Sequence, residues 1–96
     1  MTGYVIFEVK EVFDSGKLQK YKEAFVSSFT KYGGELMIGP GRTKVVEGDH
    51  FEYVGCVRFG SFEQAELWYS SSEYTAAKKI REGAANVNAL IVEGKF

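Results

Sequence analysis

The chain has 96 residues, enough for one small domain near the lower limit of independent stability. Its formal net charge is −1, and its acids and bases are interspersed, so it lacks the basic stripe of a nucleic-acid-binding protein. It contains no apolar run that could cross a bilayer, no basic leader-like stretch, and a single Cys56. We therefore expect a cytoplasmic protein without nucleic-acid or membrane partners.

Aromatic residues are abundant for a chain of this length. Eight Phe, six Tyr and one Trp are more large apolar area than one small core normally absorbs. We therefore expect part of this area to lie at a subunit interface, with a homodimer as the simplest assembly.

The first half of the chain predicts a strand, a helix and a second strand. In residues 3–12 the apolar side chains Val5, Phe7 and Val9 share one face, which predicts a strand covered by helices on that face. Asp14 or Ser15 offers a helix N-cap. Spacings of three and four then connect one apolar stripe, Leu18, Tyr21, Phe25, Phe29 and Tyr32. Gly33-Gly34 ends this helix, and Glu35–Glu47 reads as a strand interrupted at Gly39-Pro40-Gly41.

The second half predicts a strand, a broken helix and a last strand. Gly48-Asp49 makes a turn into the strand Tyr53–Phe59. Ser61 and Gln64 form a capping-box pattern for a helix that Ser70-Ser71-Ser72 interrupts, and Ser71 or Ser72 caps a second short helix. Gly83 ends that helix, and Val87–Glu93 is the last strand.

The element order is therefore β-α-β-β-α-β. It predicts a ferredoxin-like α+β sandwich, in which a four-stranded antiparallel sheet has both helical segments on one face. Two such sheets packed face to face would hide the other face and make a dimeric α/β-barrel. We expect one domain over residues 1–96 with this arrangement.

Several short motifs resemble the bacterial domain-of-unknown-function family thirteen-thirty, and they span almost the whole chain. They are Tyr32-Gly33-Gly34, Glu47-Gly48-Asp49, Ser61-Phe62, Trp68-Tyr69, Ser71, Glu73-Tyr74, Arg81 and Val92-Glu93-Gly94. The resemblance implies a soluble bacterial dimeric α/β-barrel without an established activity. The family often has Arg-Gly-Gly at positions 39–41, Trp at His50 and Glu at Arg58. The chain departs from that pattern, and we expect Arg58 to supply a cation near residues 39–42 instead, which makes Arg58 a further candidate ligand-binding residue.

The candidate ligand-binding residues lie mainly in the broken helix. Tyr74 and Arg81 are seven positions apart and share a helix face, with Trp68 and Tyr69 one turn earlier in the chain. A guanidinium and phenols around an apolar cavity can bind a small organic acid or a phenolic ligand. The alternative is that Trp68 and Tyr69 are core residues and that Arg81 pairs with an acid such as Glu93.

His50 and Tyr74 are the candidate catalytic residues, because either could move a proton. An exposed turn histidine is the alternative interpretation for His50. Cys56 reads as a small buried hydrophobic residue, and one His with one distant Cys predicts no metal site and no cofactor.

Two classes of function stay open. The first is a small-molecule-binding barrel, with cofactor-less isomerase or monooxygenase-like chemistry as an extension by analogy to the fold. The second is a non-enzymatic structural or metabolite-binding dimer. An apolar pocket that reaches Arg81 and two tyrosines would favour the first class.

Overall fold

The computed structural model describes residues 1–96 as four strands and three helices. In chain order they are β1 (Gly3–Val12), α1 (Ser15–Lys31), β2 (Glu35–Ile38), β3 (Tyr53–Phe59), α2 (Phe62–Tyr69), α3 (Ser72–Ile80) and β4 (Ala85–Glu93). Each strand pairs antiparallel with its neighbours in the order β2-β3-β1-β4. This is the predicted ferredoxin-like α+β sandwich, with its second helix broken in two.

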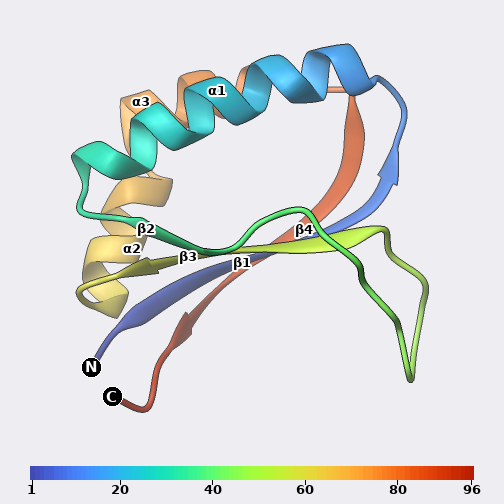
Figure 1. Ribbon diagram of the computed structural model, residues 1–96. Helices are drawn as coiled ribbons and strands as arrows, with labels where there is room; N and C mark the ends of the chain where they lie inside the picture. The colour runs from blue at the N-terminus through green and yellow to red at the C-terminus, as the bar shows by residue number, and fades with distance from the viewer.

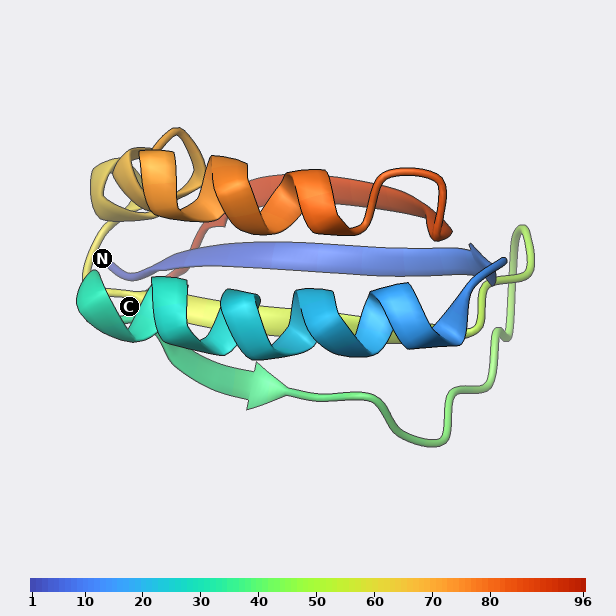
Figure 2. The same cartoon turned by 90° about the horizontal axis from the view of Figure 1, so that it is seen from above.

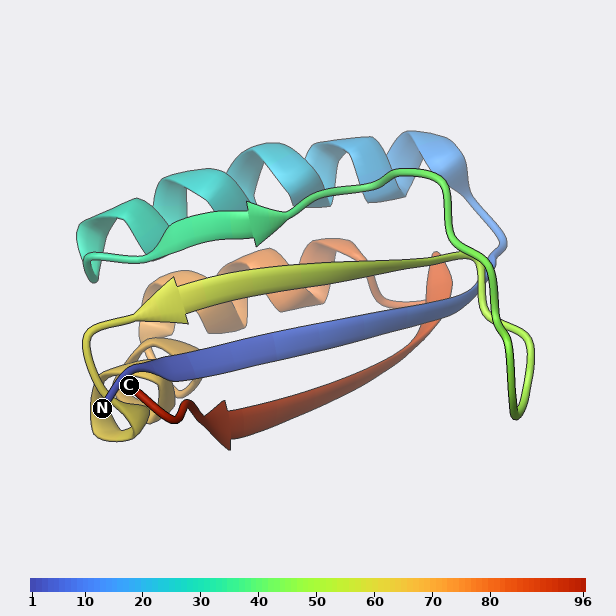
Figure 3. The ribbon, with the colours of Figure 1, turned by 60° about the horizontal axis from the view of Figure 1, so that its bottom comes forward.

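The molecule has two layers, a sheet and the helices that cover one of its faces (Figure 1). Seen from above, α1 and α3 run side by side along the strands, with β1 between them (Figure 2). The opposite face of the sheet carries no helix (Figure 3). No helix in the fold combines the length and the apolar character that a membrane crossing requires.

The alternation predicted for residues 3–12 is confirmed in β1. Val5, Phe7 and Val9 point toward the helices and are at most 6% exposed. Tyr4 and Ile6 lie on the uncovered face and are only partly buried. Because successive strand residues point to opposite faces, the sequence pattern alone separates the core from the open surface.

The long helix α1 begins and ends as predicted. Asp14 is its N-cap, and the Asp14 carboxylate accepts a hydrogen bond from the Lys17 backbone N–H at 3.0 Å. After the C-cap Tyr32, Gly33 takes a positive φ of 75°, which costs a residue without Cβ little. The apolar stripe between these ends packs onto the sheet.

The break between α2 and α3 is made by serine caps. The Ser61 hydroxyl accepts from the Gln64 backbone N–H at 3.0 Å, and the Ser71 hydroxyl accepts from the Tyr74 backbone N–H at 3.1 Å. The Gln64 side chain does not complete a capping box, because its amide donates to the Tyr32 carbonyl at the end of α1. Gln64 therefore connects the start of α2 to the end of α1.

One expectation about the sheet is wrong. The second strand does not extend from Glu35 to Glu47, because β2 ends at Ile38 and residues 41–46 have no regular structure. The β2 strand lies at the edge of the sheet, and Pro40 has no N–H with which to continue the ladder. The connection to β3 leaves the sheet edge and returns as a projecting loop (Figure 3).

Candidate functional site

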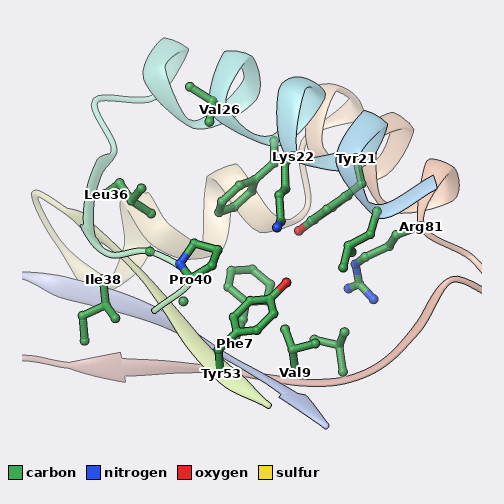
Figure 4. Close-up of a pocket in the computed structure, with 15 residues that line it drawn as sticks. Phe7, Val9, Tyr21, Lys22, Val26, Leu36, Ile38, Pro40, Tyr53 and Arg81 are labelled. Atoms are coloured by element: carbon green, nitrogen blue, oxygen red, sulfur yellow. The ribbon is translucent and has the colours of Figure 1, made fainter. Parts of the chain in front are cut away.

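A cavity of about 140 Å³ lies between α1 and the helix-covered face of the sheet (Figure 4). Its walls come from β1 (Phe7, Val9), α1 (Leu18, Tyr21, Lys22, Phe25, Val26), β2 and the residues after it (Leu36, Ile38, Gly39, Pro40), β3 (Tyr53, Gly55), the end of α3 (Arg81) and β4 (Val87). An engineered apolar cavity of about 150 Å³ holds a benzene molecule. This cavity therefore has room for a ligand of about one ring.

The cavity exists because a helix-facing strand position lacks a side chain. Gly55 pairs with Phe7 across β3 and β1, and it points to the same face as Tyr53 and Val57. A Cβ atom built on Gly55 would meet no atom closer than 3.9 Å. A glycine in a strand often marks a place where another molecule approaches the backbone closely. Here the missing side chain leaves space that the neighbouring aromatic rings do not fill.

One end of the cavity carries a small polar network. The hydroxyl oxygens of Tyr21 and Tyr74 are 3.0 Å apart and hydrogen-bonded, and both side chains are buried. Arg81 Nη2 donates to the Tyr74 hydroxyl at 3.5 Å, and the guanidinium lies 5.3 Å from the centre of the Tyr21 ring. The network joins α1 to the end of α3.

The protonation states of this network follow from its burial. Burial raises the pKa of Tyr21, and the adjacent Tyr74 raises it further. Burial lowers the pKa of Arg81, but its interactions with Tyr74 and Tyr21 outweigh that effect and raise it overall. Burial also raises the pKa of Tyr53, with a further contribution from the charge of Glu52. These raised pKa values keep the Tyr21 and Tyr53 phenols protonated and the Arg81 guanidinium charged near neutral pH.

Arg81 has no acidic partner. The two ion pairs of the molecule are Lys31–Glu73 and Arg58–Glu35, so the expected alternative of an Arg81–Glu93 pair is wrong. Arg81 Nε is buried and has no hydrogen-bond partner. A buried polar atom without a partner is costly, and it is rare enough in proteins to call for an explanation.

The other aromatic candidates, Trp68, Tyr69 and Tyr74, are not part of the cavity wall. Trp68 is fully buried, and its Nε1–H donates to the Ser28 hydroxyl at 3.1 Å. The Trp68 and Tyr69 rings pack against Tyr74 at centroid distances of 4.3 and 5.1 Å. Trp68 thus lies in the buried core cluster of the domain. Tyr74 is not part of the cavity wall, but its hydroxyl is hydrogen-bonded to two wall residues, Tyr21 and Arg81.

The remaining two candidates lie away from the cavity. Arg58 Nη2 is 3.5 Å from a Glu35 carboxylate oxygen, and Arg58 pairs with Glu35 in the β2–β3 register on the uncovered sheet face. The expectation that Arg58 lies near residues 39–42 is therefore wrong. His50 is exposed in the loop between β2 and β3 and is not part of the cavity wall.

Three polar wall residues were not among the site residues predicted from the sequence, namely Tyr21, Lys22 and Tyr53. Lys22 Nζ lies 5.4 Å from the centre of the Tyr53 ring, and Figure 4 shows Tyr21, Lys22 and Tyr53 extending into the same space. Tyr53 could have been found, because it shares its strand face with the buried Val57. Lys22 falls beside the apolar stripe of α1 and reads as a solvent-exposed charge, so no signal marks it.

The fold and the cavity together define a ferredoxin-like domain with a small apolar pocket under its first helix. The chain belongs to the family described as "Domain of unknown function (DUF1330)", whose model matches residues 2–95. This confirms the family indicated by the sequence motifs. No curated protein is significantly similar to the chain in sequence.

Solved structures share the fold at low sequence identity. A protein of unknown function from Rhodopseudomonas palustris is 14% identical with a TM-score of 0.74, over 99% of this chain and 83% of that one. A dimeric ferredoxin-like protein of unknown function from Jannaschia sp. CCS1 is 12% identical with a TM-score of 0.72, over 98% and 100%. A candidate antibiotic biosynthesis monooxygenase from Nitrosomonas europaea is 12% identical with a TM-score of 0.56, over 99% and 90%.

Proposed function

We propose that the protein is a homodimer that binds a small organic molecule of about one ring in the cavity beneath α1. The observation that carries this proposal is an apolar cavity of about 140 Å³ with an unpaired, charged Arg81 in its wall. Ligand sites in proteins combine apolar walls with a few convergent polar groups in this way. The cavity lies on the helix side of the sheet, whereas the sequence suggested a pocket inside a barrel.

The uncovered face of the sheet supports the homodimer. Ile6 pairs with Cys56 on β3 and with Leu90 on β4, so these three side chains form an apolar row across the sheet. Leu90 is 43% exposed and Val92 is 36% exposed in the single chain. An apolar sheet face is stable in water when another layer covers it, and a second copy supplies a matching face. The Jannaschia relative is described as dimeric.

We expect sedimentation equilibrium at micromolar concentration to give twice the mass of the chain. Leu90→Glu places a charge in the middle of the proposed interface and should yield a monomer, since an unpaired charge is costly to bury. Leu67→Glu is the matched control, because Leu67 is exposed on α2, away from the uncovered sheet face, and should leave the dimer intact. A monomeric wild-type chain would contradict the proposed assembly.

The ligand proposal predicts that single-ring organic compounds raise the melting temperature, because a ligand that binds only the folded state stabilises it. Gly55→Val should abolish this effect, since its side chain fills the cavity while adding apolar contacts to the core. Gly60→Val is the control, because the exposed Gly60 follows β3 and lies outside the cavity wall. The proposal fails if no ring compound stabilises the wild type, or if Gly55→Val is stabilised equally.

A cofactor-less isomerase or monooxygenase-like activity is the second candidate. It is supported by the Tyr21–Tyr74–Arg81 network, whose donors could stabilise negative charge that develops on a bound oxygen. Against it, none of the fifteen wall residues is Asp, Glu, His or Cys, so the wall offers no ready proton acceptor. Mass spectrometry and NMR of the ligand after incubation with the protein in air separate the two candidates. Oxygenation would raise the ligand mass and isomerisation would change its NMR spectrum at constant mass, whereas binding alone changes neither.

A further inference from the structure

We propose that Arg81 is the receptor for the carboxylate of a single-ring organic acid, with the ring in the apolar part of the cavity. This inference rests on the proposed function, because it assumes that the cavity holds a molecule of that size. It adds the charge of the ligand, the group that recognises it and its orientation.

The charge of the cavity wall is the first argument. Lys22 and Arg81 are its only ionisable groups besides the tyrosines, and no carboxylate lines it. Two cations elsewhere in the molecule do pair with acids, Lys31 with Glu73 at 3.3 Å and Arg58 with Glu35 at 3.5 Å. Arg81 is in addition partly buried, where an uncompensated charge is more costly than at the surface. A wall with two cations and no anion is complementary to an anionic ligand.

The position of the guanidinium is the second argument. Arg81 is the C-cap of α3, and the Tyr21 ring and the Tyr74 hydroxyl hold its side chain in place. Only Nη2 has an acceptor, at the long distance of 3.5 Å, while the buried Nε has none. A guanidinium can also bind a carboxylate through the two parallel N–H donors of its Nη atoms, and in Arg81 these are occupied only by the long Nη2 bond to Tyr74. Because Nε is buried, the Nη atoms are the donors that we assign to the ligand.

The tyrosine pair supplies the third argument. Arg81 donates to the Tyr74 oxygen, which leaves the Tyr74 hydroxyl able to donate to Tyr21. The Tyr21 O–H is then free to donate into the cavity that its side chain lines. Phenol hydroxyls that stay protonated are donors for an ionised carboxylate. A neutral phenol as ligand would accept such a bond but would leave the charge of Arg81 uncompensated.

The test compares benzoate with benzyl alcohol, a neutral molecule of nearly the same size, by isothermal titration calorimetry. We expect the wild type to bind benzoate more tightly. Arg81→Gln should weaken benzoate about 10- to 100-fold, because a hydrogen bond to a charged group contributes about 1.5–3 kcal/mol, and should leave benzyl alcohol unchanged. Lys79→Gln removes an exposed charge from the same helix, outside the cavity wall, and should change neither affinity.

A second measurement needs no variant. The benzoate affinity of the wild type should fall as salt is raised from about 0.01 to about 0.3 M, because salt screens the attraction between the carboxylate and the cations of the cavity wall. The affinity for the neutral benzyl alcohol should stay constant. Equal binding of the two compounds, or an equal loss of both in Arg81→Gln, would overturn the carboxylate proposal and leave the ring-sized cavity standing. Binding of neither compound would count against the proposed function itself.

Discussion

Replacing Trp68 with alanine is expected to lower the free energy of unfolding by about 3–5 kcal/mol, the range for large-to-small changes of buried aromatic residues. Trp68 is 0% exposed, and its ring contacts Phe59 and Tyr74 at centroid distances of 5.3 and 4.3 Å. Its removal leaves a cavity in the middle of this cluster and deprives the buried Ser28 hydroxyl of a donor. A small domain has only about 5–15 kcal/mol of stability in total, so the loss would be a large part of it.

Urea denaturation at one fixed protein concentration measures this effect, because the stability of a dimer depends on concentration. Leu67→Ala is the matched control, since Leu67 is the preceding residue of α2 and is 55% exposed. It should change the free energy of unfolding by about 0.5 kcal/mol or less. Trp68→Phe keeps a ring but removes the hydrogen bond to Ser28, and it should fall between the two. Equal losses for Trp68→Ala and Leu67→Ala would contradict the core role of Trp68.

The same packing explains why the sequence identifies only one wall residue, Arg81, among the candidates from the broken helix. Trp68 and Tyr69 pack on one side of Tyr74, and Tyr74 in turn holds Tyr21 at the cavity. Helical spacing indicates that Tyr74 and Arg81 share a face, which the structure confirms through their hydrogen bond. Spacing along one helix does not reveal which partner from α1 covers that face.

Much of the fold could be predicted because local rules determine it. Alternation in residues 3–12 defines the buried face of β1, and side-chain oxygens of Asp14, Ser61 and Ser71 cap the helices where the sequence indicated. These features depend on neighbours within a few positions of the chain. The length of β2 does not depend on such near neighbours, because an edge strand continues only as far as its single partner strand and the chain direction allow.

The cavity could not be predicted for the opposite reason. It arises where Gly55 leaves a space opposite α1, and where Arg81 comes near two tyrosines but no acid. Both facts depend on which elements face each other in three dimensions. The position of Arg58 shows the same limit. Strand parity alone places it on the face opposite Tyr53, but the β2–β3 register is needed to pair it with Glu35.

Replacing Gly3 with alanine is the second large effect that we expect. A Cβ atom on Gly3 would lie 2.6 Å from the Ser61 carbonyl carbon and 2.7 Å from Phe62 Cα, and would also overlap the Ser61 carbonyl oxygen. All three are backbone atoms at the start of α2, so no side-chain rotation can relieve the contact. Overpacking of this kind costs about 1–3 kcal/mol and occasionally more. The start of β1 and the N-cap of α2 must therefore move apart.

Gly60→Ala is the matched control, and we expect it to change the free energy of unfolding in the opposite direction. Gly60 follows β3 directly, a Cβ atom added to it would meet nothing within 4 Å, and its φ is not positive. At such a position alanine stabilises by about 0.4–1 kcal/mol, because it restricts the unfolded chain. Urea denaturation should therefore show a lower midpoint for Gly3→Ala and an unchanged or higher one for Gly60→Ala. Equal midpoints for the two variants would contradict the close backbone contact of Gly3 with Ser61 and Phe62. They would also mean that this contact between β1 and α2 is not needed for stability.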